Sequence, residues 1–141
     1  MACARADLIL VNVNPAFLAD ELAFCLNKVG VKALILAESL KKINYVDILR
    51  KALQLEHNTS VLKSPRIPSL EHVVVLSENK TPGALLWKDL LAIESKSVGA
   101  QLVERESQIT FEDVANIQFT SGTTGYPKAV TLSHHSILNN G

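Results

Sequence analysis

The chain has 141 residues, of which 48% are hydrophobic and 20% charged, a composition that supports a buried core and excludes the disordered class. Its 14 basic and 14 acidic side chains cancel and form no basic block, which disfavours nucleic-acid binding. The longest apolar stretch, residues 8–13, is far shorter than the ~20 residues of a membrane span, and no targeting peptide is visible.

The first part of the chain predicts a strand followed by a helix. Residues 8–13 are rich in leucine, isoleucine and valine and lead into Asn14-Pro15, a pattern typical of a buried strand that leaves through a turn. The helix should end at Gly30. Its inner face is predicted to consist of Leu18, Leu22, Leu26 and Val29.

A second strand and helix are expected next. Residues 31–37 predict a second buried strand, and Ser39 is positioned to cap the helix that follows. The inner stripe of this helix is predicted to contain Ile43, Val46, Ile48, Leu49, Ala52 and Leu53. The side chains expected to face water are Lys41, Lys42, Arg50 and Lys51.

The middle of the chain predicts shorter elements between loops. Residues 57–69 indicate a surface loop, residues 71–76 a third strand, and residues 79–83 a turn. A short helix is expected over residues 85–93, with Trp87 and either Leu90 or Leu91 on its apolar side. Residues 94–108 show no clear period and are interpreted as a connector.

The last part of the chain predicts a strand that delivers a polar loop. Residues 116–120 alternate between apolar and polar side chains, as a strand does. Strands separated by helices indicate an α/β fold with a largely parallel sheet flanked by helices.

The loop itself predicts a phosphate-binding site. Its glycines let the backbone turn tightly and bring N–H groups to an anion, its serine and threonines add hydroxyl donors, and its lysine supplies a positive charge. The residues of this candidate site are Thr120, Ser121, Gly122, Thr123, Thr124, Gly125, Tyr126, Pro127 and Lys128. Their spacing differs from that of the Walker loop. A solvated turn is the alternative interpretation of such a composition.

The run TSGTTGYPK resembles the phosphate-binding signature of the AMP-forming acyl-CoA synthetases, the adenylate-forming superfamily that includes luciferases and peptide-synthetase adenylation domains. The resemblance implies that a short strand over residues 129–132 and a helix opening at Ser133-His134-His135 follow the loop. Residues 6–15 and the helix with Asp20 and Glu21 look like the segment before this loop in mitochondrial medium-chain fatty acyl-CoA ligases. Members of this family are several times longer. The resemblance therefore implies that residues 1–141 are part of the large N-terminal AMP-binding domain, truncated at both ends.

The resemblance also implies a function. In this family a carboxylate reacts with ATP to give an acyl-adenylate and pyrophosphate, and coenzyme A then displaces AMP. ATP, magnesium, coenzyme A and a medium-chain fatty acid are the expected cofactor and substrates, and the mitochondrion is the expected location. No residue of this chain is assigned a catalytic or metal-ligating role. The alternative hypothesis is a non-catalytic, truncated chain that binds an anion or nucleotide weakly.

Two positions of the loop depart from the family pattern. Tyr126 is bulkier than the small residues often found before the proline, and its side chain is expected to project outward. Ala129 replaces the glycine usual after the lysine, which would be costly only at a positive φ angle. Since Ala129 lies at the start of a predicted strand, we expect a negative φ and an unchanged loop path.

Other chemistry-bearing residues are interpreted as structural. His134 and His135 are expected at a helix start, with at least one imidazole in solvent. The acidic pairs Asp20-Glu21 and Glu104-Glu106 are better explained as helix-start and surface charges than as catalytic dyads. Ser121 lacks the sequence context of a hydrolase nucleophile. The spacing of Cys3 and Cys25 favours free, reduced thiols.

Overall fold

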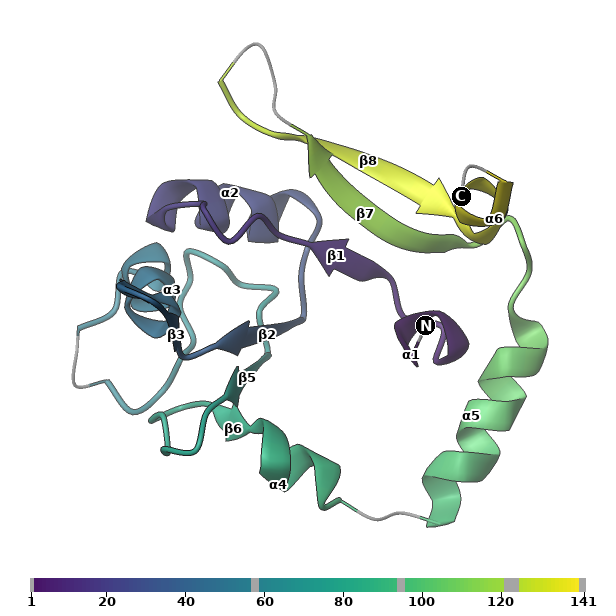
Figure 1. Cartoon of the computed structure of the whole chain (residues 1–141), viewed down its shortest axis with the longest axis horizontal. Helices are drawn as coiled ribbons and strands as arrows, with labels where there is room; N and C mark the ends of the chain where they lie inside the picture. The colour runs from purple at the N-terminus through teal and green to yellow at the C-terminus, as the bar shows by residue number, and fades with distance from the viewer. Residues whose placement is uncertain (1, 57–58, 94–95, 121–124, 140–141) are drawn as a thin grey trace. The chain divides into compact units, whose positions relative to one another are not determined.

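A computed structural model of the chain describes residues 2–56, 59–93, 96–120 and 125–139 (Figure 1). The chain divides into two compact units, the first made of Met1–Asn14 and Glu94–Gly141 and the second of Pro15–Ile93. Helices and strands alternate along much of the sequence, and parallel strand pairs occur in both units. The predicted α/β fold class is confirmed.

The first unit contains a mixed sheet. Its elements are α1 (Ala2–Arg5), β1 (Leu10–Asn12), α5 (Lys96–Gln108), β7 (Val114–Thr120), β8 (Lys128–Ser133) and α6 (His134–Asn139). The central strand is β7, which pairs in parallel with β1 and antiparallel with β8 (Figure 1). The predicted strands on both sides of the polar loop and the predicted helix after them are therefore confirmed.

The second unit contains a parallel sheet covered by helices. Its elements are α2 (Ala19–Lys28), β2 (Ala33–Ala37), β3 (Ser39–Leu40), β4 (Ile43–Asn44), α3 (Tyr45–Leu53), β5 (His72–Leu76), β6 (Leu85–Leu86) and α4 (Trp87–Leu91). The sheet has the order β2-β5-β6, and β3 and β4 form a separate antiparallel hairpin. Helix α2 packs against α3, and α3 packs against β2.

Helix α2 ends where the sequence predicts. Gly30 has a φ of +63°, the left-handed conformation that glycine adopts without strain, and the N–H of Val31 donates to the carbonyl oxygen of Leu26 at 3.0 Å. Leu22 and Leu26 are buried as expected. Leu18 is instead 68% exposed, because it precedes the first helical turn and lies outside the helix.

Helix α3 begins later than predicted, because residues 39–44 form the β3–β4 hairpin. The capping residue is Asn44 rather than Ser39: its side-chain oxygen accepts a hydrogen bond from the backbone N–H of Asp47 at 3.0 Å. Ile43 lies in the hairpin and is exposed, so its predicted place on the inner stripe is wrong. Val46, Leu49 and the last two residues of the helix are buried as predicted.

Arg50 contradicts the prediction that it faces water. Only 5% of the residue is exposed, and its guanidinium donates hydrogen bonds to the backbone carbonyls of Thr59 at 3.0 Å and Pro82 at 3.3 Å. These carbonyls belong to two irregular segments that are distant in sequence. Arg50 therefore links both irregular segments to α3 through hydrogen bonds from its side chain, where no strand or helix supplies backbone partners.

The segment between α3 and β5 forms an irregular connection, as predicted, but contributes to the core. Leu62, Ile67 and Leu70 are buried beneath this connection. No sequence period marks them, since they lie in neither a helix nor a strand. The turn prediction over residues 79–83 is confirmed by the lack of regular structure and by the positive φ of Gly83.

The predicted helix over residues 85–93 is shorter than expected. Its first two residues form β6, which pairs with β5, and α4 occupies Trp87–Leu91. Leu90 is partly buried whereas Leu91 is exposed, which selects the first of the two alternatives for the apolar side.

The predicted connector over residues 94–108 is wrong, because α5 occupies Lys96–Gln108. None of its residues with a described side chain is buried, so no apolar period reveals the helix in the sequence. Its glutamate, glutamine, alanine, leucine and arginine residues have good helix propensity. The guanidinium of Arg5 in α1 also pairs with the carboxylate of Glu106 at 2.8 Å.

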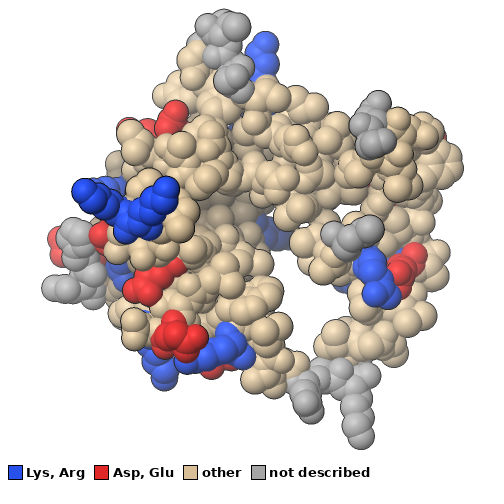
Figure 2. All heavy atoms as spheres, in the orientation of Figure 1, with Lys and Arg blue, Asp and Glu red and all other residues tan. Residues whose placement is uncertain are grey.

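The strands are less buried than predicted. Leu10 and Ile35 are both exposed, Ile35 by 52%, so β1 and β2 are not the fully buried strands that the sequence predicts. None of the helices in the described ranges combines the length and apolar character that a membrane crossing requires. On the face drawn in Figure 2, described basic and acidic side chains lie in small mixed groups among uncharged residues.

Candidate phosphate-binding site

The two ends of the predicted phosphate loop meet across the β7–β8 hairpin. Thr120 is the last residue of β7, Lys128 is the first residue of β8, and the two are direct cross-strand partners. Side chains of such partners project from the same face of a sheet. Both residues are exposed, so a hydroxyl donor and an ammonium group are presented together at one edge.

The middle of the loop, Ser121–Thr124, lies outside the described residues, which include its last part. Gly125 has a φ of +108°, and a Cβ added there would meet nothing within 4 Å. Glycine is therefore favoured at position 125 by the backbone conformation and not by a lack of room for a side chain. Pro127 is buried, and Tyr126 is 61% exposed, as expected for an outward projection.

Ala129 fits the backbone at this edge. It lies in β8 opposite Phe119, and it is not among the described non-glycine residues with positive φ. The replacement of the family's usual glycine therefore causes no left-handed strain. This outcome agrees with the prediction that φ is not positive at Ala129, and the unchanged path of the loop stays a prediction.

The opposite end of the hairpin is fixed by α6. The backbone N–H groups of His134 and His135 donate to the carbonyls of Asp113 at 3.1 Å and Phe111 at 2.7 Å. The Phe111 and His135 rings lie 5.6 Å apart. His135 is exposed, which confirms the prediction of a helix start with a solvated imidazole.

Asp113 lies beside this helix start. Its carboxylate accepts a hydrogen bond from the Thr110 N–H at 2.7 Å, and this bond, with a smaller contribution from His134, holds the pKa of Asp113 below its ordinary value. The sequence gives no sign of this carboxylate–histidine proximity, because 21 positions separate the two residues. It arises only when α6 packs next to the start of β7.

Three of the four acidic residues considered as catalytic dyads have structural partners. Glu21 accepts a hydrogen bond from the N–H of Leu18 at 2.9 Å, and Asp20 pairs with Arg66 at 2.6 Å. Glu106 pairs with Arg5, which lowers the pKa of the glutamate and raises that of the arginine. No group of three or more potential metal ligands occurs in the part of the chain that the structure describes. Both cysteines are free thiols, as predicted.

The second unit has a shallow hollow of about 550 Å³ at the carboxyl ends of β2 and β5. Its lining residues are Glu38, Leu76, Ser77, Glu78, Asn79, Trp87 and Lys88. Sequence analysis missed it, although ligands of open α/β sheets often bind at this edge and polar residues directly follow both strands. The signal was therefore present in the sequence.

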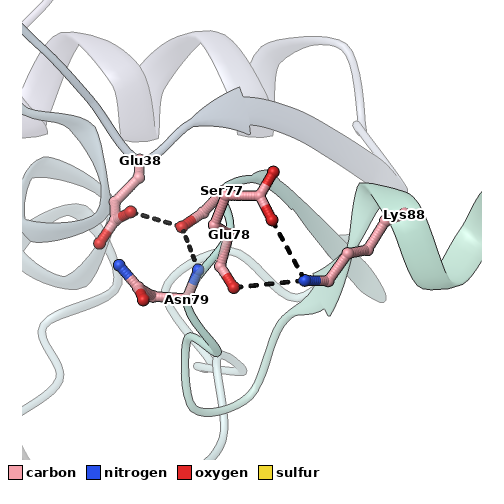
Figure 3. Close-up of polar contacts among 5 residues, drawn as sticks. All are labelled: Glu38, Ser77, Glu78, Asn79 and Lys88. Atoms are coloured by element: carbon pink, nitrogen blue, oxygen red, sulfur yellow. Dashed lines mark hydrogen bonds and ion pairs between the residues drawn. The ribbon is translucent and has the colours of Figure 1, made fainter.

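The polar groups of this hollow bind one another (Figure 3). The Ser77 hydroxyl donates to the Glu38 carboxylate and accepts from the N–H of Asn79 at 2.9 Å. The ammonium group of Lys88 lies 3.3 Å from the Glu78 carboxylate. Since these groups are already paired, the β7–β8 edge is the stronger candidate for binding an anion.

Comparison with known proteins agrees with the loop and fold. The model of the family described as AMP-binding enzyme matches residues 1–141. The chain belongs to this family. This membership confirms the family resemblance that the loop sequence indicates.

Relatives in this family include the mitochondrial medium-chain acyl-CoA ligase ACSF2 of Danio rerio, 41% identical over 141 residues, and that of Mus musculus, 43% identical over 143 residues. Each alignment covers 99% of this chain and 23% of the relative. The crystal structure of the anthranilate CoA ligase AuaEII in complex with anthranoyl-AMP superposes with a TM-score of 0.62 at 20% identity, covering 90% of this chain and 20% of that one. The shared fold is that of the N-terminal domain of adenylate-forming ligases.

Proposed function

We propose that residues 1–141 supply the ATP-phosphate-binding loop of an AMP-forming acid–CoA ligase. The observation that carries this proposal is the pairing of Thr120 with Lys128 across the β7–β8 hairpin, in a chain of the AMP-binding family. The proposed contacts with the β- and γ-phosphates are Thr120, Ser121, Thr123, Thr124 and Lys128. Gly122 and Gly125 set the backbone path, and Tyr126 and Pro127 complete the loop.

The proposed reaction has two steps. A carboxylate oxygen of the acid attacks the α-phosphorus of ATP, and the bond to the bridging oxygen breaks to release pyrophosphate. The sulfur of coenzyme A then attacks the acyl carbon, releasing AMP, and the thiol proton passes to solvent. The loop contributes to the first step, because donors fixed around the β- and γ-phosphates orient the leaving group and stabilise its negative charge.

Magnesium enters this proposal as part of the substrate MgATP. The described edge offers a threonine hydroxyl and a lysine ammonium group, and neither residue is a carboxylate. Mg²⁺ in nucleotide sites is usually held by substrate phosphates, water and one or two carboxylates. The described residues of this edge therefore fit the phosphates rather than the metal ion.

The proposed acid and location come from the relatives. Those from Danio rerio and Mus musculus are named as mitochondrial medium-chain acyl-CoA ligases. We therefore propose a medium-chain fatty acid as substrate and the mitochondrion as location. Octanoate, compared with acetate and palmitate, is a suitable probe of chain length in a ligase of the relatives' length that contains this segment.

The test of the proposed function is replacement of Lys128 by alanine. We expect Lys128→Ala to weaken MgATP binding by about 1.5–3 kcal/mol, the range for hydrogen bonds to charged groups, which is roughly 12- to 150-fold. The measurements are isothermal titration with MgATP and the adenylation rate in a ligase containing this segment. Lys63→Ala is the matched control, because Lys63 is an exposed lysine of the second unit. Equal MgATP binding by the Lys128→Ala variant and by the unmodified ligase would contradict the proposal.

The alternative is a non-catalytic chain that binds an anion weakly. The chain spans 23% of the length of these relatives. Incubation with MgATP, octanoate and coenzyme A, carried out on the purified chain and on a ligase of the relatives' length that contains this segment, separates the two hypotheses, because only the proposed function predicts thioester formation by the longer protein. We expect no thioester above a control without protein from these 141 residues by themselves, and thioester formation only from a ligase of the relatives' length.

A further inference from the structure

Asn116 is a buried polar residue in the middle of β7. Only 6% of it is exposed, and its Nδ2 donates a hydrogen bond to the backbone carbonyl of Leu10 in β1 at 2.8 Å. Its Oδ1 atom is also buried and has no hydrogen-bond partner among the described residues. The side chain of Asn116 therefore donates one hydrogen bond, whereas its buried acceptor oxygen accepts none from the described residues.

Stability does not explain an asparagine at this position. An unpaired buried acceptor destabilises the folded state, and asparagine is depleted in strands. A leucine has nearly the same shape and would remove the unpaired oxygen. A polar residue that stability alone does not favour is a candidate for a role in function.

The hydrogen bond of Asn116 strengthens a very short strand pairing. β1 pairs with β7 over only three residues, Leu10–Asn12, opposite Asn116, Ile117 and Gln118. Short pairings specify strand register weakly. The Nδ2–carbonyl bond adds a further cross-strand connection at the first of these three pairs.

The β1–β7 pairing ends close to the sheet edge that carries Thr120 and Lys128, which we call the phosphate-binding edge. Asn116, Gln118 and Thr120 occupy every second position of β7, so their side chains point to the same face of the sheet. Thr120 is opposite Lys128 in β8. The last pair of β1, Asn12 with Gln118, lies two residues before Thr120. The bond made by Asn116 therefore holds β7, the strand that carries Thr120 and that pairs with β8 at Lys128.

We propose that Asn116 is a positioning residue for the phosphate-binding edge. By bonding β7 to β1 at Leu10, it fixes the strand that carries Thr120. This strand in turn pairs with β8, which carries Lys128. This inference rests on the proposed function of the loop. The role of this polar side chain is to orient the donors for phosphate rather than to increase stability.

The first test compares Asn116→Leu with the unmodified chain by amide hydrogen exchange. We expect the amides of Leu10–Asn12 and Gln118–Thr120 to exchange roughly 2- to 12-fold faster, the range that the loss of one hydrogen bond supports, with an unchanged or higher unfolding midpoint. MgATP binding should weaken by up to about 100-fold, as a misplaced binding group can cause. Unchanged exchange in these two segments would overturn the inference.

The matched control is Asn27→Leu in the second unit. Asn27 makes the same type of bond, from Nδ2 to the backbone carbonyl of Arg66 at 2.7 Å. This variant should alter exchange near Arg66 and leave β1, β7 and MgATP binding unchanged. An equal loss of MgATP binding in both variants would indicate a general structural effect and overturn the positioning role.

A measurement on the unmodified chain keeps the inference testable if Asn116→Leu does not fold. The side-chain NH₂ signal of Asn116 in an NMR spectrum should be protected from exchange with water by its bond to Leu10, and free exchange would overturn the inference. Failure of a ligase of the relatives' length that contains this segment to bind MgATP or pyrophosphate would instead contradict the proposed function. The exchange results would then still decide whether Asn116 holds β7 to β1.

Discussion

At the scale of single residues, Arg50 organises the second unit. Its buried guanidinium bonds the carbonyls of Thr59 and Pro82 to α3. Both carbonyls belong to segments without regular structure, so no strand or helix partner can satisfy them. The aliphatic stem of an arginine packs like an apolar side chain, which lets its charged end reach such groups from a helix.

Replacement of Arg50 by methionine should destabilise the second unit. Methionine keeps much of the stem but removes the charged donors, so we expect the free energy of unfolding to fall by about 1.5–3 kcal/mol. Urea denaturation measures the change. Lys51→Met is the control, because the adjacent Lys51 is exposed and its loss should leave stability nearly unchanged. Equal stability of the two variants would contradict the role given to Arg50.

The two cysteines should differ in reactivity. Burial, with a smaller contribution from Glu21, raises the pKa of the Cys25 thiol to about 11, whereas Cys3 is partly exposed. Since the thiolate is the reactive form, we expect a maleimide reagent at pH 7.5 to label Cys3 but not Cys25 in the folded chain, and both in denaturant. Mass spectrometry identifies the labelled residue, and a Cys3→Ser variant should remain unlabelled when folded.

The raised pKa of Cys25 also predicts the effect of alkaline pH on stability. In the unfolded chain this thiol ionises near its ordinary pKa of 9.0, whereas in the folded chain it remains protonated until about pH 11. The stabilising contribution is therefore complete below pH 9 and is lost as pH rises toward 11. A Cys25→Ala variant should lack this part of the pH dependence.

At the scale of elements, one glycine lies within α5 and another follows α2, and their backbone conformations differ. Gly99 lies within the exposed helix α5, and Gly30 follows α2 with a φ of +63°. A Cβ added at either position would meet nothing within 4 Å. The two sites therefore differ in backbone conformation rather than in available space.

Alanine substitutions at these glycines should have opposite effects. Gly99→Ala should stabilise α5 by about 0.8–1.0 kcal/mol, because alanine is the better helix former. Gly30→Ala should destabilise the second unit by about 1–2 kcal/mol, because alanine is strained in the left-handed region. Circular dichroism during thermal unfolding measures both effects. Stabilisation by Gly30→Ala would show that glycine is not needed to end α2.

At the scale of the whole molecule, exposed apolar residues should cause self-association. Leu8, Ile9 and Leu10 in the first unit and Ile35 in the second unit are exposed. Open apolar strands are templates for pairing with another chain. We expect sedimentation velocity to show association that increases with concentration and that Ile35→Lys reduces. Val61→Lys, in an irregular segment, should have less effect, and a monomer at all concentrations would contradict this expectation.

Much of the fold could be predicted because the strand and helix patterns are local. The apolar segment after the predicted surface loop located β5, the helical spacing of apolar residues located α2, and the apolar–polar alternation of residues 116–120 located β7. The end of α2 followed from the conformational freedom of one glycine, Gly30. The candidate phosphate site also followed from the sequence, since a glycine- and hydroxyl-rich loop after a strand has few structural uses. Its contacts with ATP stay a prediction.

What the sequence by itself determined about this protein is its α/β class, its family and the positions of its candidate site residues. The tertiary structure decided three features that depend on partners outside the local pattern. Arg50 is buried with hydrogen bonds to two carbonyls, Asn116 makes only one of its side-chain hydrogen bonds, and α3 is capped by Asn44 rather than by Ser39. The tertiary structure also placed Thr120 opposite Lys128. The physical reason is that local patterns report intrinsic backbone preference and amphipathic faces, whereas a buried polar group is stable only where folding brings its hydrogen-bond partners.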